Sequence, residues 1–132
     1  MVTDMPRKAV IYARFSSDRQ TEMSIEAQAR ACREYASSND CTITGEYVDE
    51  AISGTTNKRA AYQRLMRDAK SGKFDTILIH KYDRIARSLI EHVMLAQRLE
   101  EYGVELIAVA QAFDNSTKEG RLSTAIQWVL SQ

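Results

Sequence analysis

Residues 8–14 read KAVIYAR and residues 74–80 read FDTILIH. Both stretches are short, apolar and rich in β-branched or aromatic residues, a composition typical of buried strands. Apolar residues that recur with a period of two predict two further strands. Apolar residues at helical spacing predict helices in the segments between the strands. The further strands are Thr42–Asp49 and Val104–Ala110. The helices are Ser24–Ser38, Arg59–Ser71, one that follows a turn with Asp83 and runs to Tyr102, and a last one from about Glu119 to the end.

This alternation of strands and helices predicts one α/β domain with a mostly parallel central sheet and helices on both faces. Ser24 is a plausible N-cap for the first helix, and Gly72 and Gly103 are placed to end the second and third. In such sheets, ligands and chemistry gather beyond the carboxyl ends of the strands. The residues at those ends are therefore the first candidates for a functional site.

The composition fits a globular chain, with 44% hydrophobic and 27% charged residues. No apolar run reaches the length of a membrane span, and no signal-peptide pattern precedes the first strand, so we expect a cytoplasmic protein. Cys32 and Cys41 form no CxxC pair, which favours two unpaired thiols over a zinc site or a disulfide. The net charge is zero, so nucleic-acid affinity must come from a local cluster of charge or from another domain.

The first strand ends in Arg14-Phe15-Ser16-Ser17. If the strand stays extended, Arg14 and Ser16 point the same way. A serine beside an arginine at this position is a reasonable nucleophile next to an anion-binding group. Taken alone, the pattern fits a polar strand end better than a nucleophile site, because short motifs are often coincidental.

The third strand leads into Lys81-Tyr82-Asp83-Arg84-Ile85-Ala86-Arg87. If a helix begins near Asp83, Arg84 and Arg87 share a face, and two guanidinium groups there can grip phosphate oxygens. Asp83 would then cap the helix or orient an arginine. The alternative is a surface pair of Asp83 with Arg87, worth only about 0.3–0.5 kcal/mol.

The loop after the second strand adds Ser53, Thr55 and Arg59 to these strand ends. Together the segments suggest a phosphodiester site with a hydroxyl nucleophile and several fixed cations. We expect no metal and no cofactor, because His80 and His92 are the two histidines of the chain and no recognisable ligand spacing occurs.

Four segments, taken in order, resemble the catalytic domain of serine site-specific recombinases, the family of resolvases, invertases and large serine integrases. The form Ser24-Ile25-Glu26-Ala27-Gln28 and the loop Ser53-Gly54-Thr55-Thr56 lean toward the large serine recombinase or integrase branch. The segments are Tyr12–Gln20 followed by Ser24–Gln28, then Asp49–Thr55, Lys81–Arg87 and Phe113–Leu122.

The resemblance implies that Ser16 attacks a DNA phosphodiester and forms a 5′-phosphoserine intermediate, which conserves the bond energy for rejoining. It implies that Arg14, Arg84 and Arg87 are core arginines, that Arg59 is another, and that Asp83 orients an arginine or assists proton transfer. Supporting or phosphate-contacting positions fall on Gln20, Gln28, Ser53 and Lys81. On this basis Arg84→Ala should abolish cleavage while leaving the fold largely intact.

A stripe of Leu122, Ala125, Ile126, Val129 and Leu130 follows helical spacing up to the end of the sequence. We therefore expect residues 1–132 to be one catalytic domain cut within a long helix, with the DNA-binding domain absent. The resemblance implies double-stranded DNA as the partner, contacted mainly through the missing part, and dimers that assemble into tetramers.

Three other classes fit the predicted sheet. A nucleotide-binding domain lacks support, because neither GxGxxG nor GxxxxGK[ST] is present. A serine hydrolase lacks its GxSxG elbow. An idle regulatory or interaction module stays open, although the joint presence of Ser16 and the arginines speaks against it.

Overall fold

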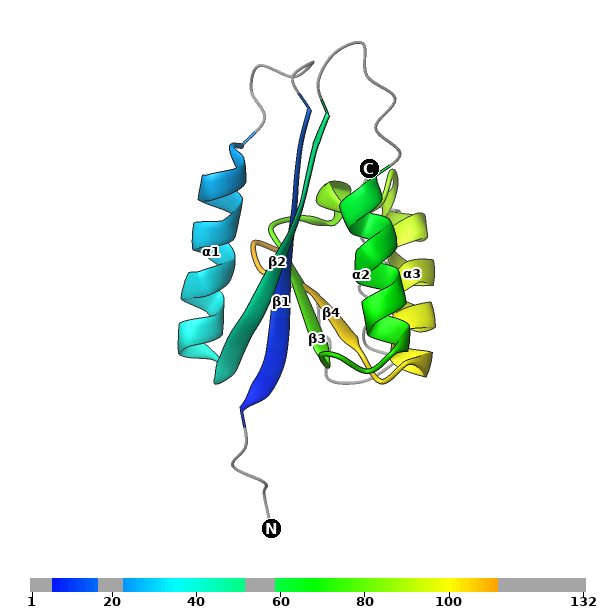
Figure 1. Ribbon diagram of the computed structural model, residues 1–132. Coiled ribbons are helices and arrows are strands. Elements are labelled where there is room, and N and C mark those ends of the chain that lie inside the picture. The colour runs from blue at the N-terminus through cyan, green and yellow to red at the C-terminus, as the bar shows by residue number, and fades with distance from the viewer. Residues whose placement is uncertain (1–5, 17–22, 52–58, 112–132) are drawn as a thin grey trace.

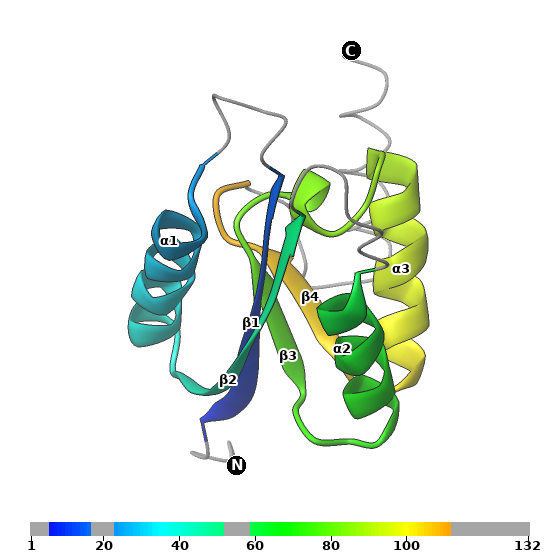
Figure 2. The ribbon, with the colours of Figure 1, turned by 45° about the horizontal axis from the view of Figure 1, so that its top comes forward.

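Four parallel strands form one sheet in the order β2-β1-β3-β4. In the computed structural model, residues 6–16, 23–51 and 59–111 are described. Helix α1 covers one face of the sheet, and α2 and α3 cover the other (Figures 1 and 2). The predicted α/β sheet with helices on both faces is therefore confirmed. The strands are β1 (Arg7–Ser16), β2 (Cys41–Ala51), β3 (Thr76–Ile79) and β4 (Glu105–Ala108), and the helices are α1 (Ile25–Ser38), α2 (Ala60–Lys70) and α3 (Leu89–Glu101).

The two strands β1 and β2 are much longer than their neighbours. They pair with each other from Arg7 to Ser16 on β1, whereas β3 pairs with β1 only at Ala9–Ile11. The carboxyl half of β1 therefore projects beyond β3, as Figure 1 shows. This projecting half carries Arg14 and Ser16.

Capping residues account for the ends of the helices. Ser24 caps α1, and its Oγ accepts a hydrogen bond from the Ala27 amide at 3.1 Å, as predicted. Gly72 and Gly103 follow α2 and α3 with φ angles of +77° and +79°, in the left-handed region that glycine adopts without strain. Both predicted helix ends are therefore confirmed.

The third helix follows the turn with Asp83, as predicted, but α3 begins only at Leu89, so the condition that a helix begins near Asp83 is not met. Ser88 is its N-cap and accepts a hydrogen bond from the Glu91 amide at 3.1 Å. The Glu91 carboxylate reaches back to the Arg87 amide at 3.0 Å, close to a capping box. A short 3₁₀ helix, η1 (Tyr82–Arg84), precedes this start.

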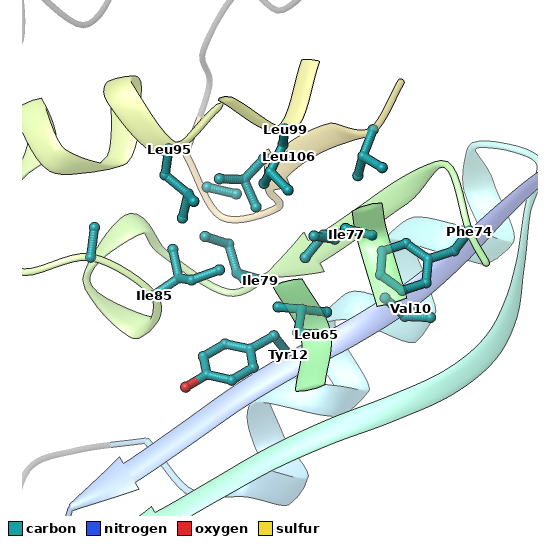
Figure 3. Close-up of a cluster of buried hydrophobic side chains, with 14 of the residues drawn as sticks. Val10, Tyr12, Leu65, Phe74, Ile77, Ile79, Ile85, Leu95, Leu99 and Leu106 are labelled. Carbon is teal, nitrogen blue, oxygen red and sulfur yellow. The ribbon is translucent and has the colours of Figure 1, made fainter. Parts of the chain in front are cut away.

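Two apolar clusters lie on opposite faces of the sheet. The larger one packs β1, β3 and β4 against α2 and α3, and Figure 3 shows Leu65, Ile77 and Leu99 inside it. The smaller one packs α1 against the other face and contains Cys32. Cys32 and Cys41 are both free thiols, as the sequence predicts. Among the described residues, no helix is both long and apolar enough to cross a membrane.

His92 is a buried polar residue on α3, with its ring 6.2 Å from that of Tyr82. Burial lowers the pKa of His92 from 6.5 to about 4. At pH values between these two pKa values, His92 binds a proton in the unfolded chain but not in the folded chain. The free energy of unfolding therefore falls as the pH falls from about 7 to about 4. The shift corresponds to at most about 3 kcal/mol.

We therefore expect urea unfolding at pH 7 and pH 4.5 to give a smaller difference in unfolding free energy for His92→Leu than for the unchanged protein. The same difference in both proteins would show that His92 does not contribute to the acid sensitivity.

Candidate active site

A polar cavity of about 270 Å³ opens beside the projecting half of β1. Three arginines line it, and each comes from a different segment: β1, the residue before α2, and the loop before α3. The lining residues are Arg14, Arg59, Asp83, Ile85, Ala86 and Arg87. The fold thus brings together three of the four arginines that the sequence singled out.

Gln28 on α1 holds the backbone of β1 at Arg14. Its Oε1 accepts a hydrogen bond from the Arg14 amide at 3.2 Å, and its Nε2 donates to the Arg14 carbonyl at 2.9 Å. Gln28 is fully buried, and its Nε2 also donates to the Met23 carbonyl at 2.8 Å. Since β3 pairs with β1 only up to Ile11, the side-chain amide of Gln28 takes the place of a neighbouring strand.

Ser16 is the last residue of β1, and its backbone is in register with Ala51 of β2. The strand therefore stays extended from Arg14 through Ser16, which is the condition set by the sequence prediction. The structure describes the backbone of Ser16 and not its side chain.

Arg84 is turned inward and is only 5% exposed. Its Nη1 donates to the Arg14 carbonyl at 3.1 Å, and its Nε contacts Asp83 Oδ1 at 3.1 Å. Arg87, by contrast, is exposed and lines the cavity. The predicted shared face of Arg84 and Arg87 is therefore wrong, because η1 and the loop after it are not α-helical. Asp83 contacts Arg84, and the helix cap predicted as its alternative role belongs to Ser88.

Arg59 is clamped between two aromatic rings and a carbonyl. Its guanidinium carbon lies 4.1 Å from the ring centre of Tyr62 and 5.9 Å from that of Tyr12. Its Nη2 donates to the Ile85 carbonyl at 2.8 Å and contacts the Tyr12 hydroxyl at 3.4 Å. The charged group is therefore held in place at the cavity, so little conformational entropy remains to be lost when an anion binds.

Asp49 is a buried carboxylate that the sequence analysis did not select as a site residue. It accepts hydrogen bonds from the Tyr12 hydroxyl at 2.7 Å and from the amides of Ala61 and Tyr62 at 2.9 and 3.0 Å. The two amides belong to the first turn of α2, whose N-cap residue Arg59 has φ of 57° and no side-chain cap. Asp49 therefore caps α2 from β2 and fixes the helix start that carries Arg59.

Tyr12 was also missed, because it lies in a strand that the sequence marks only as core. Burial raises the pKa of Tyr12, and its hydrogen bond to Asp49 raises it further. The hydroxyl therefore stays protonated and can donate to Asp49. The sequence held one signal for this contact: Asp49 is a charged residue on a predicted strand, and a charged side chain on the inward side of a strand needs partners.

The other predicted site residues lie away from this cavity or outside the described residues. Lys81 is exposed, precedes η1 and does not line the cavity. His80 is partly buried, and burial together with Lys81 and Arg84 lowers its pKa. Gln20 and Ser53 lie outside the described residues. In the part of the chain that the structure describes, no three His, Cys, Asp or Glu side chains gather as a metal site.

Asp49→Asn should lower the free energy of unfolding by about 2 kcal/mol, because hydrogen bonds to a buried charge are lost or reversed. Urea unfolding measures this change directly. Asp40→Asn is the matched control, because Asp40 is exposed and its positive φ of 56° suits asparagine. Equal small losses in both variants would contradict the capping role of Asp49.

Known proteins similar to this chain show which family it belongs to. The family model described as "Resolvase, N terminal domain" matches residues 9–132. A putative DNA recombinase of Bacillus subtilis (strain 168) is 32% identical over 124 residues, which cover 92% of this chain and 24% of the relative. The chain spans about half of the phage and transposon relatives gin, of Escherichia phage Mu, and Tn917 resolvase, of Enterococcus faecalis (47% and 53%).

Two solved structures are similar over nearly the whole chain. The N-terminal catalytic domain of TP901-1 integrase has a TM-score of 0.74 at 28% identity and covers 95% of this chain and 94% of that one. A resolvase family site-specific recombinase from Streptococcus pneumoniae has a TM-score of 0.77 at 32% identity, with 95% and 87% covered. Both likenesses agree with the sheet and helices described above.

Proposed function

Because this chain belongs to the resolvase N-terminal domain family, we propose that it is the catalytic domain of a serine site-specific DNA recombinase, with Ser16 as the nucleophile. The observation that carries the proposal is the meeting of Arg14, Arg59 and Arg87 at one cavity, beside the strand that ends in Ser16. A cluster of cations next to a serine suits an attack on a phosphodiester.

In the proposed step, Ser16 Oγ attacks the phosphorus of one DNA strand and gives up its proton. A bond forms between Oγ and phosphorus, and the bond from phosphorus to the 3′ oxygen breaks. The leaving 3′ oxygen takes a proton and becomes a free 3′-hydroxyl, while the 5′ side stays attached as a phosphoserine ester. Attack by the 3′-hydroxyl of another strand reverses the step, so exchange and rejoining need no ATP.

The arginines supply the electrostatic part of this chemistry. Negative charge accumulates on the non-bridging phosphoryl oxygens in the transition state, and guanidinium groups stay charged at any working pH. Arg59 is already fixed by Tyr62 and the Ile85 carbonyl, so it needs little rearrangement to act. Arg84 holds the site residues in position, because its side chain donates to the Arg14 carbonyl and to Asp83.

Most of the DNA affinity of the working protein should come from outside residues 1–132, because this chain has 18 basic and 18 acidic residues. We propose that these residues form one catalytic domain acting on double-stranded DNA in the cytoplasm, within dimers that assemble into tetramers. The family resemblance supports this assembly.

The test is to trap the covalent intermediate. The full-length protein is incubated with DNA that contains its recombination site, labelled at the 3′ end of one strand. The labelled strand should migrate with the protein on a denaturing gel and be released by protease. Digestion with trypsin and a nuclease should leave a nucleotide on the peptide Phe15–Arg19, and mass spectrometric fragmentation should place it on Ser16 and not on Ser17.

Two outcomes would overturn the proposal in different ways. If the protein binds the DNA in a mobility-shift assay and no adduct forms under any cleavage condition, the chain is an idle module. If the nucleotide is found on another residue, recombinase chemistry stands and the assignment of Ser16 is wrong.

A further inference from the structure

Gln111, the residue three positions after β4, contacts the turn that carries the third group of site residues. Its side-chain Oε1 accepts a hydrogen bond from the Tyr82 amide at 2.9 Å. Tyr82 is the first residue of η1, so its amide has no acceptor within that short helix. A side chain from the neighbouring strand segment therefore satisfies the start of the turn.

The backbone on either side brings Gln111 to this place. Just after β4, the Val109 amide donates to the carbonyl of Ile79, the last residue of β3, at 2.8 Å, and the Ala110 amide donates to the His80 carbonyl at 3.0 Å. The two segments thus stay hydrogen-bonded up to the first residue after β3 and the second residue after β4. At Tyr82 the donor lies on the segment after β3, and the acceptor is the Gln111 side chain on the segment after β4.

The turn held in this way sets the position of three groups of the site. Asp83 and Arg87 line the cavity, and Arg84 reaches the Arg14 carbonyl. The turn has few hydrogen bonds of its own, from the amides of Arg84, Ile85 and Ala86 to the carbonyls of Lys81 and Tyr82. A slip at Tyr82 would therefore move the cations, and small displacements of positioned groups cost large factors in rate.

We propose that Gln111 is a positioning residue of this site: its carbonyl oxygen fixes the start of η1 and so the placement of Asp83, Arg84 and Arg87. The inference rests on the proposed recombinase function for its effect on rate. The contact itself does not depend on that function.

Two variants separate the hydrogen bond from the bulk of the side chain. Gln111→Leu removes the acceptor and keeps similar size, whereas Gln111→Glu keeps an oxygen at the same position. With saturating DNA, Gln111→Leu should form the covalent adduct about 10-fold more slowly or worse, with DNA affinity within about 2-fold, and Gln111→Glu should stay within about 3-fold of the unchanged protein. Gln97→Leu on α3 is the matched control for the substitution and should change neither value.

Hydrogen exchange at the Tyr82 amide gives a second readout that needs no activity. The amide should exchange at least about 10-fold faster in Gln111→Leu and keep its protection in Gln111→Glu. Unchanged exchange in Gln111→Leu, or equal rate loss in the Leu and Glu variants, would overturn the inference. Failure of the unchanged protein to form any adduct would instead overturn the proposed function, and the exchange experiment would still decide whether Gln111 holds the turn.

Discussion

Ser16→Ala is expected to abolish the covalent protein–DNA adduct, with a loss of about 10⁴-fold or more. A methyl group cannot attack phosphorus, and a neighbouring water cannot replace the serine in forming a protein-linked product. The backbone should be unaffected, because Ser16 is extended and in register with Ala51 of β2, and alanine adopts extended backbone angles without strain. The measurement is the 3′-labelled strand on a denaturing gel, with DNA binding checked by mobility shift.

Ser17→Ala is the matched control, since it removes the adjacent hydroxyl from the same segment. This variant should keep the adduct, and both variants should bind DNA and unfold at the same urea concentration as the unchanged protein. An adduct that survives in Ser16→Ala and disappears in Ser17→Ala would move the nucleophile by one residue. Loss in both would point to the geometry of the segment and not to one hydroxyl.

The fold could be predicted because apolar periodicity reports burial, and burial decides which face of each element packs. The strand of residues 8–14 and the helix capped by Ser24 both follow from this local pattern. Element ends were predicted less well because neighbours decide them. β1 runs on to Ser16 since β2 and Gln28 satisfy its peptide groups. Helix α3 starts at Leu89 since Ser88 and Glu91 supply a better cap than Asp83.

In the candidate site, too, some features follow from the local sequence pattern and others depend on neighbouring segments. Strand ends drew attention to Arg14 and Arg87, and the structure places both at one cavity. Side-chain direction could not be predicted where it depended on the backbone, as it does for Arg84 in η1. Asp49 and Tyr12 were missed for a related reason, because their importance lies in a contact between two strands and the start of α2. Sequence spacing carries no direct information about such a contact.

The burial of Arg84 changes what its removal should do. Sequence alone treats Arg84 as a site group whose loss leaves the fold largely intact, yet the side chain is 5% exposed and ties η1 to β1. Arg84→Ala should lower the free energy of unfolding by about 2–4 kcal/mol, because the Arg14 carbonyl and the Asp83 carboxylate lose their donor. Adduct formation should fall by about 10²–10³-fold even where the variant is fully folded.

Arg87→Ala separates the two effects. Its side chain is exposed at the cavity, and the hydrogen bond to Glu91 is made by the Arg87 backbone, which alanine keeps. This variant should lose about 10²-fold in the rate of adduct formation and change stability by less than about 0.5 kcal/mol. Urea unfolding measures the free energy of unfolding of Arg84→Ala and Arg87→Ala, and single-turnover experiments measure their rates of adduct formation. If Arg84→Ala proved as stable as Arg87→Ala, the inward contacts of Arg84 would not support β1. If Arg87→Ala cleaved normally, the exposed guanidinium at the cavity would have no part in stabilising the transition state.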